Sequence, residues 1–285
     1  MSEEFERVKA ERPLTNASGD TLLRLTQENQ DAFLRRWSIC PNVDFRDDGK
    51  VKRMVMGTQF PLCNPIFGAK LSRSGANQVV HGVVEESARM RVPRLWIVDS
   101  RTTPHDIGKT LLENGFKLVA ENTAMSLDLR HLPSGKPLPA DFGIEPVEDE
   151  KSLESFVSTM DRAFDVPQSD DRILRSAEKS LMKCGKDYCQ RYLGSMSGSP
   201  AAVSLLLRTP RVAGIYCVGT LDKFRNKGIG AAMTLRAAEE AAGLGYNYCV
   251  LHATSVGHPV YRSIGFEDLG KDGLYYYGPP AGGTH

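Results

Sequence analysis

The amino-acid sequence predicts an α/β fold of the mixed-sheet (α+β) kind, repeated in two halves of the chain. Strand-like runs and amphipathic helical segments alternate through residues 142–277, which is typical of a mixed sheet covered by helices. A second, fainter series with the same order of elements lies in the N-terminal half. The chain has 285 residues and is 41% hydrophobic, so it can bury the cores of two ordinary domains.

Composition excludes several classes of partner. Lys and Arg number 36 against 35 Asp and Glu, and this balance gives no support for a nucleic-acid-binding surface. No apolar run approaches the ~20 residues that span a bilayer. Met1 to Arg12 carries both signs of charge without an apolar core, so we expect a solvated lead-in rather than a secretory signal. The sequence therefore predicts a soluble cytoplasmic protein that binds neither nucleic acid nor membrane, and it leaves a homodimer open.

The cysteines indicate reduced thiols rather than disulfides or metal ligands. The chain has six, and none forms a C-x-x-C pair or a His/Cys cluster with zinc-finger spacing. Cys217 and Cys249 stand inside apolar runs, where a thiol usually behaves as a small hydrophobe. We expect no metal site. The six positions are 40, 63, 184, 189, 217 and 249.

A segment rich in proline and glycine at 131–141 predicts a linker between a domain at 1–130 and a domain at 142–285. After it, strands, helices and turns follow in the order β-α-α-β-β-β-α-β-α-β-β. The predicted strands are 142–147, 192–196, 201–208, 212–221 and 246–253, with a terminal hairpin at 266–277 around Lys271-Asp272-Gly273. The predicted helices are 153–164, 171–183, 227–242 and 259–264.

The N-terminal half ends with an echo of this order. A helix at 76–91, a strand at 94–99 and a short helix at 107–114 precede Gly115-Phe116. In the C-terminal half a helix, a strand and a short helix precede Gly265-Phe266, 150 residues later. The matching order of elements favours an internal duplication over an unrelated capping domain.

Residues 225–231, Arg-Asn-Lys-Gly-Ile-Gly-Ala, carry the clearest chemical signal. They follow an apolar strand-like run and open a long alanine-rich helix. Unpaired N–H groups at a helix start, with the positive end of the helix dipole, bind phosphate groups well. Arg225 and Lys227 add positive charge, and Gly228 and Gly230 allow close approach to the backbone. The segment is therefore predicted to hold a pyrophosphate.

A dinucleotide-binding Rossmann domain is the competing interpretation of Gly228-x-Gly230. That fold needs several further strand–helix units and an acidic residue at the end of the next strand. Here only one more strand–helix unit follows, and its strand ends in His252-Ala253-Thr254. The context therefore disfavours a dinucleotide.

The motif Arg225-x-x-Gly228-x-Gly230 between strand and helix resembles the coenzyme A loop of the GCN5-related N-acetyltransferases. The resemblance extends over residues 142–277 and includes the order of elements and the closing segment Tyr261-Arg-Ser-Ile-Gly265-Phe266. It implies that the strands at 212–221 and 246–253 splay apart to admit the pantetheine arm. The coenzyme-contacting residues that it implies are Val218, Gly219, Thr220, Arg225, Asn226, Lys227, Gly228, Ile229, Gly230 and Ala231.

The resemblance further implies transfer of an acetyl group from acetyl-CoA to a primary amine by direct attack. Tyr261 then serves as the general acid that protonates the departing thiolate. Backbone N–H groups at Val218 or Thr220 stabilise the oxyanion. The acceptor stays open among an amino acid, a polyamine, a drug-like amine and a protein terminus. The resemblance favours a small-molecule amine, because the family includes tandem members with small-molecule acceptors.

The general base stays open at this level. A water chain is one candidate, and so are several side chains that could face the acceptor: His252, His258, Glu145, Asp161 and Asp165. The run Tyr275-Tyr276-Tyr277 is more typical of a packed strand than of a substrate site.

The N-terminal copy is expected to be degenerate. Aligning the two Gly-Phe pairs puts Leu111 where Tyr261 stands, and leucine has no proton to give. The segment ahead of its helix, Arg73-Ser-Gly75-Ala-Asn-Gln, has one glycine where the other copy has two. Two alternatives to an acetyltransferase remain: a non-catalytic acyl-CoA-binding sensor or scaffold, and a transferase of a longer acyl group.

Overall fold

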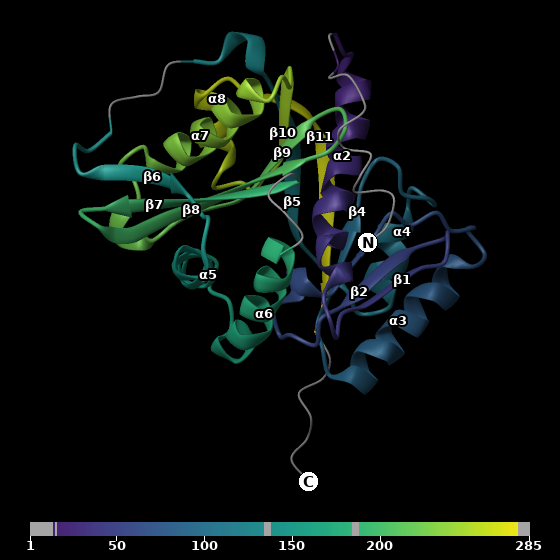
Figure 1. The fold of residues 1–285 in the computed structure, drawn as a ribbon. Coiled ribbons are helices and arrows are strands. Elements are labelled where there is room, and N and C mark those ends of the chain that lie inside the picture. Colours follow the sequence, from purple (N-terminus) through teal and green to yellow (C-terminus); the bar gives the residue numbers. More distant parts are fainter. Residues whose placement is uncertain (1–13, 15, 134–137, 184–187, 279–285) are drawn as a thin grey trace. The chain divides into compact units, whose positions relative to one another are not determined.

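The chain passes repeatedly between two compact units in the computed structural model (Figure 1). The structure describes residues 14, 16–133, 138–183 and 188–278. The first unit comprises Met1–Phe33 with Thr123–Gly270, and the second comprises Leu34–Asn122 with Lys271–His285. The lead-in that the sequence predicts at Met1 to Arg12 lies outside the described residues, as do Cys184 and the middle of the linker.

The sheet of the first unit is mixed and has the strand order β11-β5-β10-β9-β8-β7-β6. Strand β10 runs parallel to β9 and antiparallel to β5, while β6, β7, β8 and β9 form an antiparallel series. Strands β5 and β11 begin in one unit and end in the other. The strand bounds are β5 Lys117–Asp128, β6 Phe142–Pro146, β7 Cys189–Met196, β8 Ser199–Arg208, β9 Ala213–Thr220, β10 Tyr248–Ala253 and β11 Glu267–Tyr277.

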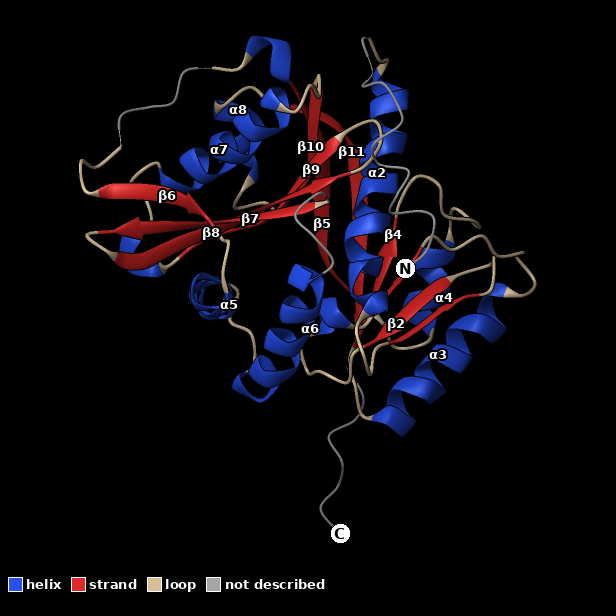
Figure 2. Ribbon diagram, viewed as in Figure 1, coloured by secondary structure: helices blue, strands red, loops and turns tan. Residues whose placement is uncertain are grey.

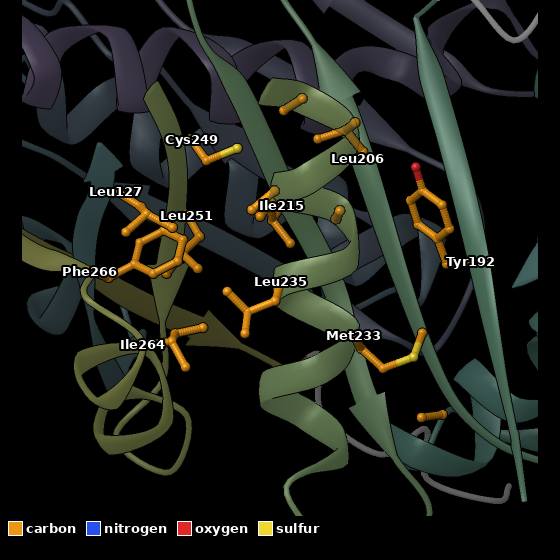
Figure 3. Packing of buried hydrophobic residues seen from close by; sticks show 14 of the residues in the cluster. Leu127, Tyr192, Leu206, Ile215, Met233, Leu235, Cys249, Leu251, Ile264 and Phe266 are labelled. Atoms are coloured by element: carbon orange, nitrogen blue, oxygen red, sulfur yellow. The ribbon is translucent and has the colours of Figure 1, made fainter. Parts of the chain in front are cut away.

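Helices cover both faces of this sheet (Figure 2). The alanine-rich helix α7 packs on one face, where Met233 and Leu235 meet Leu206, Ile215 and Leu251 (Figure 3). Small side chains on α7 allow close packing against the strands. Helices α2 and α5 bury their apolar faces on strand residues of the other parity, such as Val250 and Val203. The helix bounds are α2 Gly19–Arg35, α5 Glu150–Ala163, α6 Asp171–Lys183, α7 Ile229–Gly243 and α8 His258–Ser263.

The second unit has the strand order β1-β2-β3-β4-β11-β5. Its core gathers Ile66, Val80, Trp96 and Phe116 between the sheet and helices α3 and α4. Tyr275 and Tyr277 of β11 pack against this core, as expected for a packed strand. The bounds are β1 Asp44–Asp47, β2 Lys52–Val55, β3 Pro65–Phe67, β4 Arg94–Val98, α3 Ala76–Met90 and α4 Ile107–Glu113.

The repeated order of elements is confirmed down to single hydrogen bonds. Phe116 donates its N–H to the carbonyl of Leu111 at 3.0 Å, and Phe266 donates to the carbonyl of Tyr261 at 3.1 Å. Gly115 and Gly265 both have positive φ, +87° and +95°, which a glycine adopts without steric cost. In each unit the strand after the long helix runs parallel to its neighbour, β4 beside β3 and β10 beside β9. The matching hydrogen bonds and glycine conformations show that the two short helices end in turns of the same kind.

The strand that follows each short helix pairs with a strand of the other copy. Strand β10 pairs with β5 through six residue pairs, from Tyr248↔Asp128 to Ala253↔Thr123. Strand β4 pairs with β11, from Gly273↔Val98 to Tyr277↔Arg94. The two copies thus exchange their terminal strands. For this reason the compact units have different bounds from the predicted domains 1–130 and 142–285.

Most predicted elements of the C-terminal half are confirmed, but the terminal hairpin is wrong. Residues 267–277 form one continuous strand, because Asp272 is fully buried and Gly273 pairs with Val98 instead of turning. Helix α7 begins at Ile229 rather than 227, since Gly228 has a left-handed conformation. Helix α2 and strands β1, β2, β3 and β5 were not predicted. No helix among the described residues is long and apolar enough to cross a membrane.

Candidate functional site

Strands β9 and β10 separate soon after they meet. Their registered pairs are Cys249↔Ala213 and Val250↔Gly214, so the described residues of β9 after Gly214 pair only with β8. The pairing of β9 with β8 shifts register opposite Ser204, and Cys217 at the shift has φ +52°. A β-bulge of this kind turns backbone groups away from the regular ladder. Val218, Gly219 and Thr220 therefore lie on a strand segment whose β10 side is not paired.

The loop after β9 ends at a helix start with unused donors. Gly228 is the N-cap of α7 with φ +75°, and it has no side chain to cap the helix. The first helical donor with an acceptor is Ala232, whose N–H bonds the Gly228 carbonyl at 3.1 Å. The N–H groups of Gly228, Ile229, Gly230 and Ala231 have no acceptor among the described residues. They form a cluster of donors at the positive end of the helix dipole.

The space in front of these donors is open. A β-carbon added at Gly228 would meet no atom within 4 Å, and one at Gly230 would meet only Thr220 Oγ1 at 3.9 Å. The described residues therefore leave space at both glycines. Open donors and an electropositive helix end suit a diphosphate, so the residues present fit coenzyme A.

The two cations of the loop are placed differently. Arg225 is 54% exposed, donates to the Thr220 carbonyl at 3.1 Å and pairs with Asp222 at 2.9 Å. It thereby ties the loop to the end of β9. Lys227 has its Nζ 5.9 Å from the centre of the Phe224 ring. Asn226, between them, has φ +62°, a left-handed conformation that asparagine tolerates better than most residues.

The corresponding helix start in the second unit has two of its first N–H groups bonded to its own chain. The N–H groups of Gly75 and Ala76 both donate to the Ser72 carbonyl, at 3.1 and 3.0 Å. A β-carbon at Gly75 would lie 3.0 Å from Ser72 Oγ, and Gly75 has φ −92° rather than a left-handed conformation. Leu111 is fully buried. These contacts favour the predicted loss of function in the N-terminal copy.

Tyr261 lies on α8, which follows β10. Its ring packs against the core of the first unit, 5.9 Å from the ring of Phe266. Burial raises the pKa of the Tyr261 phenol to about 12. The phenol therefore keeps its proton at neutral pH.

The candidate bases are spread over several elements. His252 is on β10 opposite Ala124, and His258 at the start of α8 bonds Asp268 through Nε2 at 2.9 Å. Glu145 is exposed on the outer strand β6, and Asp165 is exposed just after α5. Asp161, on α5, differs from the other two carboxylates because its oxygens are buried, as are the ring nitrogens of His252.

Burial, reinforced by the neighbouring Asp171 carboxylate, raises the pKa of Asp161 to about 7. Asp171 has the opposite shift, because a hydrogen bond from Arg175 holds its pKa below the ordinary value. The sequence offered Asp161 as a candidate without its partner, since the two residues meet only where α5 and α6 pack together. The bulge at Cys217 had no sequence signal either, because a cysteine is not typical of positive φ.

A metal centre finds no support in the part of the chain that the structure describes. No group of three or more His, Cys, Asp or Glu side chains there is placed to hold a metal ion.

Comparison of the sequence with known proteins gives no match. No protein-family profile matches the chain, and no curated protein is significantly similar to it. Solved structures do match over nearly the full length. A GCN5-related N-acetyltransferase from Kribbella flavida has a TM-score of 0.68 at 17% identity, covering 92% of this chain and 97% of its own.

Two further structures agree. A GCN5-related N-acetyltransferase from Sphaerobacter thermophilus has a TM-score of 0.60 at 16% identity and covers 92% of this chain and 94% of its own. A tandem protein of the same fold from the clavulanic acid biosynthesis pathway has a TM-score of 0.58 at 12% identity. The match covers 95% of this chain and 98% of that protein. The chain thus has the fold of the GCN5-related N-acetyltransferases, in an arrangement that extends over both of its halves.

Proposed function

We propose that the protein is an acetyl-CoA-dependent N-acetyltransferase that acts on a primary amine of a small molecule. The donor cluster at Gly228–Ala231 carries this proposal, because its N–H groups have no acceptor among the described residues and such a helix start suits a diphosphate. The fold similarity supports the same class of activity.

Each part of the site has a role in this proposal. The N–H groups of Gly228, Ile229, Gly230 and Ala231 hold the diphosphate, and Lys227 adds a nearby positive charge. Arg225 and Asn226 shape the loop. The unpaired side of β9 at Val218, Gly219 and Thr220 receives the pantetheine arm and offers N–H donors to the oxyanion. Bound acetyl-CoA supplies the activated acyl group.

Tyr261 supplies the proton for the departing sulfur. A phenol whose pKa is raised to about 12 stays protonated in the resting site, so the proton is present when sulfur charge develops. As the C–S bond breaks, negative charge develops on the sulfur, whose thiol has an ordinary pKa of ~8.5. A hydrogen bond from the phenol, followed by its proton, stabilises this charge. The reaction requires both reactants to be held in line in one complex.

Calorimetry with acetyl-CoA tests the cradle. Gly228→Ala is expected to weaken acetyl-CoA binding at least tenfold, because the methyl group would take up open space beside the donors that the proposal gives to the diphosphate, and because it strains a left-handed residue. Gly245→Ala is the matched control: Gly245 lies just beyond the other end of α7, has φ +88° and also faces open space. It carries the same strain away from the cradle, so equal weakening by both variants would contradict the proposal.

Thiol release separates an enzyme from a sensor. With a panel of primary amines, the wild-type protein is expected to release free CoA, and Tyr261→Phe to lower kcat roughly 10- to 1000-fold with acetyl-CoA affinity nearly preserved. Binding without release from any amine would identify a sensor or scaffold instead. Faster release from longer acyl-CoA thioesters would redefine the acyl group.

A further inference from the structure

The first half of strand β5 lies at an open sheet edge. Its pairing with β10 begins at Thr123, and its other neighbour is β11, so among the described residues 117–122 have no partner strand on the β10 side. All five side chains from Lys117 to Glu121 are exposed. We call this segment, Lys-Leu-Val-Ala-Glu at 117–121, the β5 edge.

The backbone of the β5 edge directs hydrogen-bonding groups outward. Leu129 donates its N–H to the Asn247 carbonyl at 2.9 Å, in the register that β5 and β10 keep along their pairing. Alternate residues of a strand turn their N–H and C=O groups to the same side. Lys117, Val119 and Glu121 therefore turn theirs to the β10 side, beyond the residues that β10 pairs with. Three residues thus present donors and acceptors that another strand can bind.

The side chains of the β5 edge are apolar where an edge strand is usually protected. Leu118 is 49% exposed and Val119 55%, and an exposed alanine follows them. Edge strands that stay single normally carry charges or proline. The two outer strands of the described sheet follow this rule, because β1 reads Asp-Phe-Arg-Asp and β6 ends in Glu145-Pro146. Between its two ends the β5 edge has neither.

The charges of the β5 edge complement those of a second copy. Lys117 and Glu121 stand at its two ends, with Val119 midway. If two such strands pair antiparallel about a two-fold axis at Val119, each Lys117 lies opposite the Glu121 of the other copy. These opposite charges flank a valine–valine contact on one face, while Leu118 lies opposite Ala120 on the other face. A parallel pair in register would put like charges opposite each other.

The ion pair that Glu121 makes within its own chain does not prevent this contact. Its Oε2 lies 3.6 Å from Lys271 Nζ, and both side chains are more than half exposed. An exposed pair of this kind contributes little to stability, so Glu121 can also accept Lys117 of a second copy.

We propose that the β5 edge pairs with the same edge of a second copy, so that the protein forms a two-fold symmetric homodimer. The occupant is a second copy because the segment complements itself in charge and in side-chain size. Such a contact closes with two chains and leaves no strand edge open at that place. The inference is independent of the proposed acetyltransferase activity, because no residue of the proposed site belongs to the β5 edge.

Analytical ultracentrifugation tests the pairing with two charge reversals. Between about 1 and about 100 µM, the wild type is expected to shift from one chain to two. Lys117→Glu and Glu121→Lys each put like charges opposite each other at both ends of the paired strands, so each variant alone should sediment as a single chain. Both side chains are exposed, so the reversals should leave the fold intact.

Mixing the two variants distinguishes this register from any other contact. An equimolar mixture of Lys117→Glu and Glu121→Lys again places opposite charges across the interface, so it should form a dimer although neither variant does so alone. The double variant Lys117→Glu/Glu121→Lys should also dimerise. A mixture that stays monomeric, or single variants that dimerise like the wild type, would overturn the proposal.

Val119→Lys tests the centre of the interface. It puts two like charges at the two-fold axis, so the dimer should be lost. Leu244→Lys is the matched control, because Leu244 is an exposed leucine just after α7, and this variant should dimerise like the wild type. Equal loss in both variants would indicate unspecific apolar association and overturn the proposal, as would a wild type that is still a single chain at the highest concentration.

Discussion

At the scale of single residues, Asp161 shows how burial of a carboxylate beside a second one carries a stability cost. A buried carboxylate beside a second carboxylate is held ionised only against desolvation and like-charge repulsion. Asp171 avoids that cost because Arg175 neutralises it. Proteins tolerate such arrangements mostly where chemistry needs a shifted pKa.

Asp161→Asn is expected to stabilise the fold in a pH-dependent way. The pKa of Asp161 is 3.8 in a free chain and about 7 in the folded protein, so between these values the folded state binds more protons than the unfolded state. Stability of the wild type therefore falls as pH rises through this window. The variant should gain nothing near pH 4 and about 1–2 kcal/mol at pH 8, after allowance for partial exposure of the side chain.

Urea unfolding of both proteins at pH 4, 6 and 8 measures this difference. Asp165→Asn serves as the control, because Asp165 is exposed and its left-handed backbone suits asparagine. A gain that is equal at all three pH values would show that the carboxyl of Asp161 is not perturbed by burial.

The sequence could predict the residues whose role is local. The helix start at Gly228 and Gly230 could be predicted because strand, loop and helix follow one another in the chain. The contacts of Asp161 with Asp171 join two helices and depend on how they pack, which a single sequence does not record. Arg225 was correctly placed in the loop, but its pairing with Asp222 and Thr220 depends on the loop conformation.

At the scale of elements, helix α2 supports the strand that carries the site. Asn29 of α2 is fully buried, donates to Thr209 Oγ1 at 3.0 Å and accepts from the Tyr216 hydroxyl at 2.7 Å. Phe33 stacks on the Tyr216 ring with centroids 3.9 Å apart. These contacts fix β9 just ahead of the bulge at Cys217.

Asn29→Ala is expected to destabilise the protein by about 2–3 kcal/mol, because the Tyr216 and Thr209 hydroxyls lose a buried partner. Urea unfolding followed by circular dichroism gives the value. Glu28→Ala is the neighbouring control: Glu28 is exposed and, among the described residues, pairs with Arg24 on the same helix, so its loss should cost under about 0.5 kcal/mol. Equal effects of the two variants would mean that α2 does not anchor β9.

Helix α2 escaped prediction for a physical reason. Its buried face carries Thr26, Gln27 and Asn29 beside leucines, so polar residues interrupt the apolar stripe that signals a helix. The terminal hairpin was wrong for the opposite reason. Lys271-Asp272-Gly273 has the chemistry of a tight turn, yet pairing with β4 keeps the backbone extended. The local preference of these residues for a turn is overridden by the hydrogen bonds that pair the strand with its neighbour.

At the scale of the whole molecule, the exchanged strands make the two copies interdependent. The sheet of the first unit needs β5 from the earlier half, and the sheet of the second needs β11 from the later half. The duplication could be recognised from the order of elements, and the fold class followed from it. The exchange could not, because both copies have the same local sequence pattern whichever strand each one pairs with.

A fragment of residues 138–285 is therefore expected not to fold alone. It lacks β5, which pairs along β10, and α2, whose Leu22 and Leu25 cover Tyr248 and Val250. It would expose a strand edge and an apolar face together, a combination that favours aggregation. Co-expression with residues 1–137 restores both elements, so the two fragments should copurify as a stable complex with a cooperative unfolding transition. A cooperative transition for 138–285 by itself would show that this half holds its fold without the exchanged strand, and that β5 and α2 only add to a sheet that is already stable.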